Sequence, residues 1–295
     1  MRGVEGVSGI VVMIRRIAHL GLLMLASLGS TASAGQVVFT SIPPQKWLVE
    51  SLAGDLVQTG VLLPPGASPA TYEPTPKQMA ALDRSQLYLR IGVPFENSLL
   101  DNISSLMPEL QIVDCRVGVE LEPMDSSAHY HAPGATDPHI WLDPERMKII
   151  ARNTATALKD LLPVKAPMIE ERLDTLTRDL DETDHRVAAA LAPLTGRRVI
   201  VFHPSFGYFT RRYGLIQTAI EFDGKAPSAR RLASIVEEMG TRQARALFVQ
   251  PQFSRSSATR VARALDCEII ELDPLAGNYL TNLEHMARQI AGALR

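Results

Sequence analysis

Residues 168–191 read MIEERLDTLTRDLDETDHRVAAAL, and this stretch decides how the chain is organised. Apolar side chains recur along it at helical spacing, with no glycine or proline in between. They are Ile169, Leu173, Leu176, Leu180, Val187 and Leu191. The pattern predicts one amphipathic helix from Met168 to Leu191, about 36 Å long at 1.5 Å per residue. The helix is long for a globular protein and is not part of a strand–helix alternation, so we expect a rigid connector between two lobes.

Short apolar runs alternate with amphipathic helical runs on both sides of this connector. Four strand-like runs precede it: QVVFTS (36–41), DLVQTGVLLP (55–64), QLYLRIG (86–92) and LQIVDC (110–115). Four more follow it: RRVIVF (197–202), LIQTAIEF (215–222), ALFVQ (246–250) and CEIIELD (267–273). The alternation predicts a mostly parallel sheet with helices on both faces in each lobe. We therefore expect an α/β fold of two similar lobes, residues 35–145 and 193–295, bridged by a connector at 146–192.

The N-terminus has the features of a cleavable signal peptide. Arg15 and Arg16 precede the apolar run LGLLMLASLG, and an A-x-A cleavage site follows at Ala32-Ser33-Ala34. The apolar core is too short to span about 30 Å of hydrocarbon as a helix. We expect residues 1–34 to be removed on secretion, which leaves a soluble mature protein beginning at Gly35.

Composition and cysteine content limit the class of protein further. Of 295 residues, 46% are hydrophobic and 21% charged, which is typical of a globular protein and not of a disordered chain. The formal net charge of −2 gives no sign of a nucleic-acid surface, so we expect no nucleic-acid partner. Cys115 and Cys267 each adjoin an apolar strand-like run, which favours two separately buried thiols over a disulfide.

Three potential metal ligands stand where predicted strands end. His203 directly follows VIVF, Asp273 ends CEIIELD, and His139 leaves the loop after the fourth strand. Ligands of open parallel sheets collect at the carboxyl ends of the strands. Two imidazoles and one carboxylate suit a borderline divalent cation such as zinc. His139 and Asp273 are 134 positions apart, so they meet only if the two lobes face each other across a cleft.

Plainer interpretations exist for the same residues. A histidine after a strand is often a hydrogen-bonded structural residue, and an aspartate before proline commonly starts a turn. His185 and His285 fall on the polar sides of predicted helices, and we interpret both as surface residues. The chain contains no HExxH motif.

Several ordered motifs give the chain a family resemblance. They are SIPPQKWLVESLAGD (41–55), LLPPGASPATYEPTPKQM (62–79), DPHIWLDP (137–144), VFHPSFGYF (201–209) and LDPLAGNY (272–279). With the signal peptide, they resemble the solute-binding proteins of zinc/manganese ABC transporters, in particular the high-affinity zinc-uptake receptors. The resemblance runs from about residue 36 to the C-terminus. It implies two α/β lobes bridged by a long rigid helix, with a metal held in the interlobe cleft and delivered to a membrane permease with its ATPase.

Carried over by position, the resemblance assigns His139, His203 and Asp273 as ligands of the transported ion. That ion is Zn²⁺, with Mn²⁺ as the alternative. Manganese-selective relatives tend to carry a glutamate where His203 stands, so this histidine points towards zinc. The resemblance also implies a binding protein and not an enzyme, and we expect it to be monomeric.

Ala70 departs from the family pattern. The motif PG(A/S)xPHxYxP places the first metal-binding histidine where this chain has Ala70, and alanine cannot coordinate a metal. Three groups compete for the vacant fourth position: a loop histidine (His131 or His129), Glu73, or water.

Water in that position would leave an open site, which is the arrangement of catalytic zinc. A metal-dependent hydrolase is therefore one alternative function, although the sequence has no recognisable general-base motif. A second alternative is a receptor of the same fold that has drifted to a chelated metal or another ligand, because a fold does not fix its ligand.

Overall fold

The computed structural model describes residues 35–124, 136–221 and 245–295, together with the single positions 228, 230, 233, 234 and 237. The predicted signal peptide and the loop histidines His129 and His131 lie outside these residues, and so does most of 228–240, whose sequence SARRLASIVEEMG predicts a helix with Ser228 as N-cap.

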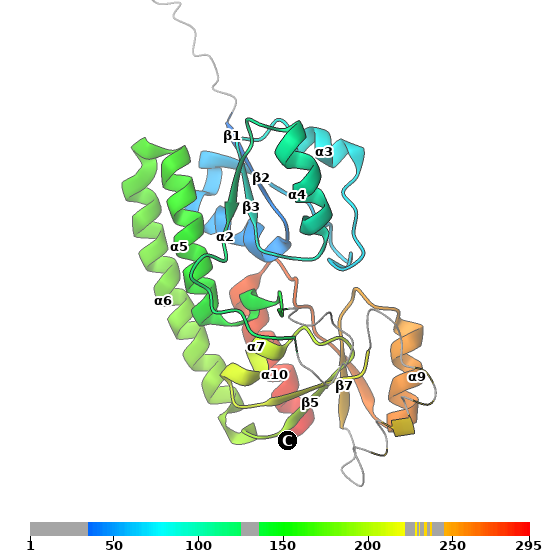
Figure 1. The fold of residues 1–295 in the computed structure, drawn as a ribbon. Coiled ribbons are helices and arrows are strands. Elements are labelled where there is room, and N and C mark those ends of the chain that lie inside the picture. The colour runs from blue at the N-terminus through cyan, green and yellow to red at the C-terminus, as the bar shows by residue number, and fades with distance from the viewer. Residues whose placement is uncertain are drawn as a thin grey trace, which may run out of the picture. The chain divides into compact units, whose positions relative to one another are not determined.

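The first sheet has four parallel strands in the order β2-β1-β3-β4. The strands are β1 (Gln36–Thr40), β2 (Val57–Val61), β3 (Leu87–Arg90) and β4 (Gln111–Asp114). Three helices connect them (Figure 1): α2 (Pro43–Ala53), α3 (Pro76–Leu82) and α4 (Phe95–Leu106). We call these strands and helices the N-terminal lobe.

The second sheet repeats this architecture with the strand order β6-β5-β7-β8, again all parallel. Its strands are β5 (Arg198–Val201), β6 (Ile216–Ala219), β7 (Ala246–Val249) and β8 (Glu268–Glu271). Its described helices are α7 (Gly207–Arg212), α9 (Arg255–Leu265) and α10 (Tyr279–Leu294). We call this part the C-terminal lobe. The two sheets have the same strand order, and the predicted α/β fold of two similar lobes is confirmed.

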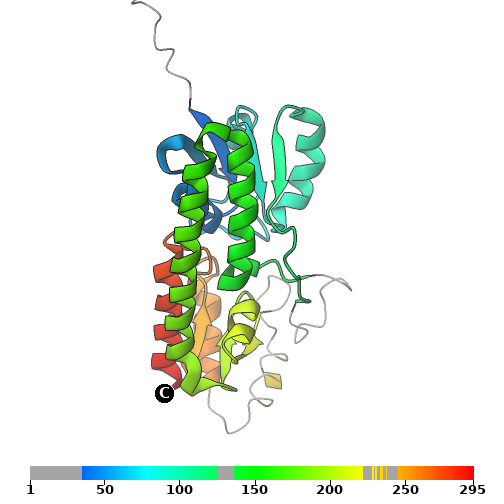
Figure 2. The same cartoon turned by 90° about the vertical axis from the view of Figure 1, so that its left-hand side faces the viewer.

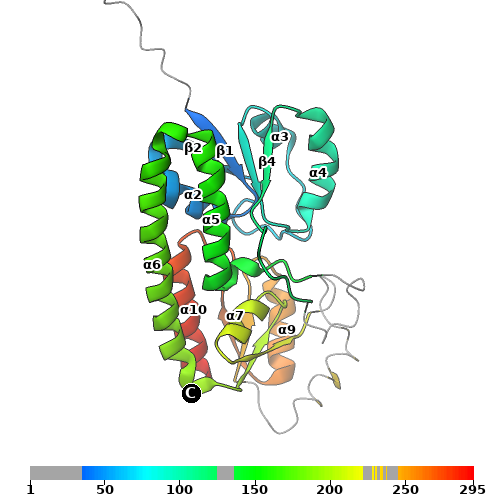
Figure 3. The same cartoon turned by 60° about the vertical axis from the view of Figure 1, so that its left-hand side comes forward.

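Two long helices connect the lobes. They are α5 (Pro144–Leu161) and α6 (Ala166–Leu191), and α6 begins two residues before the predicted start. All six apolar side chains of the predicted stripe are buried, and Thr183 is buried with them. The stripe packs against α5, α2 of the N-terminal lobe and α10 of the C-terminal lobe. Figures 2 and 3 show α5 and α6 side by side, with α10 next to the second half of α6.

Local sequence explains where the helices begin. Thr75 caps α3 in a capping box: its hydroxyl accepts from the backbone N–H of Gln78, and the Gln78 side chain reaches back to Thr75. Asp143 caps α5 by accepting the N–H of Glu145 at 2.9 Å. Prolines stand at the first turns of α2, α3, α5 and α6, where the missing N–H has no cost.

The lobes are tied to the connector by packing and by ion pairs. One hydrophobic cluster runs from β1 through α5 and α6 to α10, so the two lobes share a core. Arg212 of α7 pairs with Asp184 of α6 and, at 3.2 Å, with Glu145 of α5. Burial favours a raised pKa for Asp184, but hydrogen bonds from Arg212 and Tyr213 outweigh it and hold the pKa below its ordinary value.

Cys115 is buried and Cys267 is partly buried, and neither forms a disulfide, as predicted. Among the described residues, no helix is both long enough and apolar enough to cross a membrane.

Candidate metal site

His139 is held by the aspartate two residues before it. Its ring Nδ1 lies 2.7 Å from Oδ1 of Asp137, and its backbone N–H donates to the same oxygen at 3.0 Å. Asp137 is only 1% exposed. Because the carboxylate accepts, Nδ1 is the donor, and Nε2 is the ring nitrogen left for a metal ion.

His203 has the same arrangement in the other lobe. It lies two residues past the end of β5, and its Nδ1 contacts the carboxylate of Glu221, two residues past β6. Gln250 accepts the backbone N–H of His203 and donates to its carbonyl, while the Phe253 ring stacks on the imidazole at 4.9 Å. The backbone, one ring nitrogen and one ring face of His203 are therefore fixed.

The structure brings these two histidines together. Their ring centroids are 5.6 Å apart with an interplanar angle of 75°. Within the described residues, no hydrogen-bond partner is found for Nε2 of either ring. Buried carboxylates that orient imidazoles in this way are typical of histidines that ligate metals.

Asp273 lies beyond β8 but is not part of the same cluster. Its Oδ1 accepts from the backbone N–H of Leu275 at 3.0 Å and from Gln252 at 2.9 Å. In residues 35–124, 136–221 and 245–295, no group of three or more His, Cys, Asp or Glu side chains is close enough to hold a metal ion. The loop of Asp273 is nevertheless bonded to the segment of His139, because Trp141 Nε1 donates to the Pro274 carbonyl at 2.7 Å.

Among the described residues, Glu73 does not join this pair in a metal-binding group. Ala70 and Glu73 are both exposed, in the segment between β2 and α3. The Ala70 N–H donates to Ser68 Oγ at 3.4 Å. His131 and His129 lie outside the described residues.

The two ends of the segment that contains His129 and His131 are described, and they lie together beside Asp137. The Asp137 N–H donates to the Glu122 carbonyl at 2.8 Å, and Pro123 and Thr136 form an antiparallel bridge. The Tyr208 hydroxyl accepts from the Glu122 N–H at 2.9 Å and donates to the Asp137 carbonyl at 3.1 Å. The described residues on both sides of the segment are therefore held beside Asp137, two residues before His139.

Two arginines and a glutamate lie close to Tyr208 and its hydrogen-bond partners. The guanidinium carbons of Arg146 and Arg211 lie 4.5 and 5.1 Å from the centroid of the Tyr208 ring, and both arginines pair with the Glu122 carboxylate. Burial raises the pKa of Tyr208, so its hydroxyl keeps the proton that it donates to Asp137.

Sequence reasoning missed Asp137, Glu221 and Tyr208. A signal for Glu221 was present, because β5 and β6 were both predicted as strands. In the structure Val201 is paired with Ala219, and two residues further along each strand come His203 and Glu221. Strand pairing, which the sequence alone did not supply, is what makes the two residues neighbours.

Two α/β lobes with the same sheet order, and one carboxylate-oriented histidine at each side of their junction, are the features of a two-lobed metal-binding protein. A family model described as zinc-uptake complex component A, periplasmic, matches residues 38–293. The chain belongs to this family.

Relatives and solved structures agree with the family. A high-affinity zinc uptake system protein ZnuA from Haemophilus ducreyi is 29% identical, over 86% of this chain and 89% of that protein. A putative metal-binding protein from Chlamydia trachomatis is 27% identical, over 92% of this chain and 99% of that one. A crystal structure of ZnuA has 33% identity and a TM-score of 0.82, covering 88% of this chain and 100% of that one. The names of these relatives describe zinc uptake or metal binding.

Proposed function

We propose that this chain is the periplasmic receptor of a zinc ABC importer, which captures Zn²⁺ between its lobes and delivers it to a membrane permease with its ATPase. The observation that carries the proposal is the pair of imidazoles 5.6 Å apart, one from each side of the lobe junction. Each has its Nδ1 bound to a buried carboxylate, which leaves both Nε2 atoms for one ion. Zinc-uptake relatives from several bacteria support the same function.

The ligand set that we propose is His139, His203 and Asp273. Two imidazoles favour Zn²⁺ over Mn²⁺, which prefers carboxylate and water oxygens. Asp273 still has its second carboxylate oxygen, Oδ2, without a hydrogen-bond partner among the described residues. The Trp141–Pro274 hydrogen bond holds the loop of Asp273 against the segment of His139.

The fourth position is proposed to be filled from the segment between residues 124 and 136, by His131 or His129. Both ends of that segment are fixed beside Asp137, which is itself bonded to His139. His129 and His131 precede His139 by only a few positions, whereas Glu73 lies far from His139 in the sequence and its side chain is exposed. Glu73 and water are the competing occupants.

The same proposal includes the remaining organisation of the chain. Residues 1–34 form a signal peptide that directs export to the periplasm. Residues 35–145, 146–192 and 193–295 form the first lobe, the connector and the second lobe. The mature protein acts as a monomer, because a receptor of this kind needs only its own two lobes to enclose the ion.

Calorimetry under chelator competition tests the ligand set. His139→Ala, His203→Ala and Asp273→Ala are each expected to weaken zinc binding by more than about a hundredfold, since a lost ligand costs several kcal/mol at about 1.4 kcal/mol per decade. His185→Ala, a histidine on α6 away from the pair, is the matched control and should leave the affinity unchanged. Unchanged affinity in a ligand variant removes that residue from the set.

Two measurements on the purified native protein test the alternative functions, a receptor for a chelated metal and a hydrolase. No affinity for free Zn²⁺ would favour a receptor for a chelated metal. Turnover of model esters by the zinc-loaded protein, lost in His203→Ala, would favour an open-site hydrolase.

A further inference from the structure

Two buried aromatic residues join the lobes by reciprocal hydrogen bonds. Trp141, in the short helix η2 (Ile140–Leu142), donates from Nε1 to the Pro274 carbonyl at 2.7 Å. Tyr279, the first residue of α10, donates from its hydroxyl to the Trp141 carbonyl at 2.5 Å. Trp141 is 0% exposed and Tyr279 2%. Each donor thus reaches a backbone acceptor more than 130 positions away, and we call the pair the aromatic clasp.

The aromatic clasp lies directly beside two of the proposed ligands. The Trp141 ring meets the His139 ring edge-on, with centroids 5.3 Å apart. The acceptor of its indole N–H is the carbonyl of Pro274, the residue after Asp273. The carbonyl of Asp273 itself accepts from Asn282 of α10 at 2.8 Å. The clasp therefore fixes the segment of His139 relative to the loop of Asp273.

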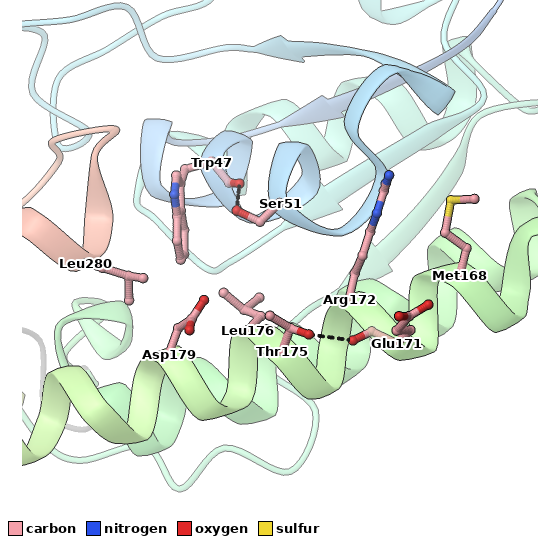
Figure 4. Close-up of a pocket in the computed structure, with 9 residues that line it drawn as sticks. All are labelled: Trp47, Ser51, Met168, Glu171, Arg172, Thr175, Leu176, Asp179 and Leu280. Atoms are coloured by element: carbon pink, nitrogen blue, oxygen red, sulfur yellow. Dashed lines mark hydrogen bonds between the residues drawn. The ribbon is translucent and has the colours of Figure 1, made fainter.

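Tyr279 is supported from behind by Trp47 of α2. The two rings are stacked, with centroids 5.0 Å apart and an interplanar angle of 29°. The outer side of Trp47 borders a pocket of about 490 Å³ between α2, α6 and α10. Figure 4 shows Trp47 in this pocket, with Leu280 and Asp179 nearby. Trp47 restrains the Tyr279 ring by stacking. The hydrogen bond from the Tyr279 hydroxyl to the Trp141 carbonyl is what fixes Tyr279 to Trp141.

We propose that Trp141 and Tyr279 are positioning residues for metal binding, which hold His139 and Asp273 in place before the ion arrives. The inference rests on the proposed function, because it takes these two residues as ligands. Coordination distances tolerate changes of only about 0.2 Å. A set of ligands held ready loses less freedom on binding than one that must be assembled. Zinc affinity should therefore depend on the Tyr279 hydroxyl, although this hydroxyl touches neither ligand.

Tyr279→Phe tests the proposal with the smallest change. Burial raises the pKa of Tyr279, so the native hydroxyl is a protonated donor that phenylalanine lacks. We expect zinc affinity in chelator competition to fall about five- to tenfold, the range that one hydrogen bond supports. Tyr88→Phe is the matched control: Tyr88 is 0% exposed, and its hydroxyl bonds Ser41 Oγ at 2.7 Å inside the N-terminal lobe. Its affinity should change less than about twofold.

A spectroscopic readout separates positioning from a merely structural role. The chain has two tryptophans, so Trp47→Phe leaves Trp141 as the only indole. In that background the metal-free Tyr279→Phe protein should show a red-shifted Trp141 emission that acrylamide quenches more readily. Added Zn²⁺ should reverse the difference, because the ion then holds the segment that the hydroxyl held.

The outcomes distinguish the two ideas. If His139→Ala weakens zinc binding and Tyr279→Phe does not, or does so no more than Tyr88→Phe, the positioning role is wrong and the metal site stands. If neither His139→Ala nor Asp273→Ala changes the affinity, the proposed function fails and the positioning role fails with it. Should Tyr279→Phe not fold, Trp141→Phe removes the other hydrogen bond, and unchanged affinity in that variant would equally overturn the proposal.

Discussion

The carboxylate behind His203 offers the sharpest test of the histidine pair. Glu221 is 3% exposed and contacts Nδ1 of the ring, so it fixes both the tautomer and the direction of Nε2. Glu221→Gln retains an acceptor and removes the charge, whereas Glu221→Ala removes the acceptor as well. A hydrogen bond with a charged partner contributes about 1.5–3 kcal/mol.

At about 1.4 kcal/mol per decade, that contribution corresponds to a loss of roughly ten- to a hundredfold in zinc affinity. We expect Glu221→Gln near the lower end and Glu221→Ala near the upper end. The assay is calorimetry under chelator competition, with thermal unfolding of the metal-free proteins measured alongside. Glu271→Gln, an exposed glutamate at the end of β8 in the same sheet, is the control. Equal affinities for Glu221→Ala and the native protein would refute the orienting role.

Three further predictions follow from other parts of the molecule. Ala70→His should tighten zinc binding. His131→Ala should weaken zinc binding at least about tenfold in the native chain but hardly at all in the Ala70→His background, and equal effects in the two backgrounds would exclude the loop histidine as a ligand. Zinc should leave the radius of gyration in small-angle scattering nearly unchanged, because α6 has no glycine and no proline after its first turn to act as a hinge; a large decrease would contradict a rigid connector. The pKa of Asp184 is lowered on folding, so its stabilisation is present above about pH 4 and is lost as the pH falls through the folded pKa. Asp184→Asn should therefore flatten the pH dependence of the unfolding free energy below about pH 4, and an unchanged slope would show that the Arg212 pair contributes nothing.

Much of the fold was predictable because the helices and strands depend on hydrophobic patterns that are local in the sequence. The apolar stripe of α6 has a period of 3.6 residues that only a helix buries on one side, and all six predicted positions are buried. Each of the eight strands in the described part of the chain was marked by a short apolar run. The strand orders were not predictable, because pairing between β1 and β3 or between β5 and β7 depends on contacts distant in sequence.

The candidate site was predictable only in part, for the same reason. Strand ends pointed to His139 and His203, since the carboxyl edge of a parallel sheet is a property of topology. The carboxylate that contacts each imidazole was not predicted. The contact of Asp137 with His139 depends on the turn before η2, and the contact of Glu221 with His203 depends on the register between β5 and β6. The hydrogen bond from Leu275 to the Asp273 carboxylate is the turn that an aspartate before proline commonly starts, whereas no sequence pattern specifies the hydrogen bond from Gln252.

The buried thiol of Cys115 has a consequence for the chemistry of a zinc carrier. Desolvation by burial raises its pKa to about 12, and the same cause raises that of Cys267 to about 11. Only a thiolate is a strong nucleophile or a zinc ligand, and soft thiolates bind zinc tightly. Both thiols therefore keep their protons at neutral pH, which makes them poor nucleophiles and weak competitors for the ion. A protein that must hand over its ion benefits from keeping its softest donor atoms protonated and leaving the ion to imidazole and carboxylate groups.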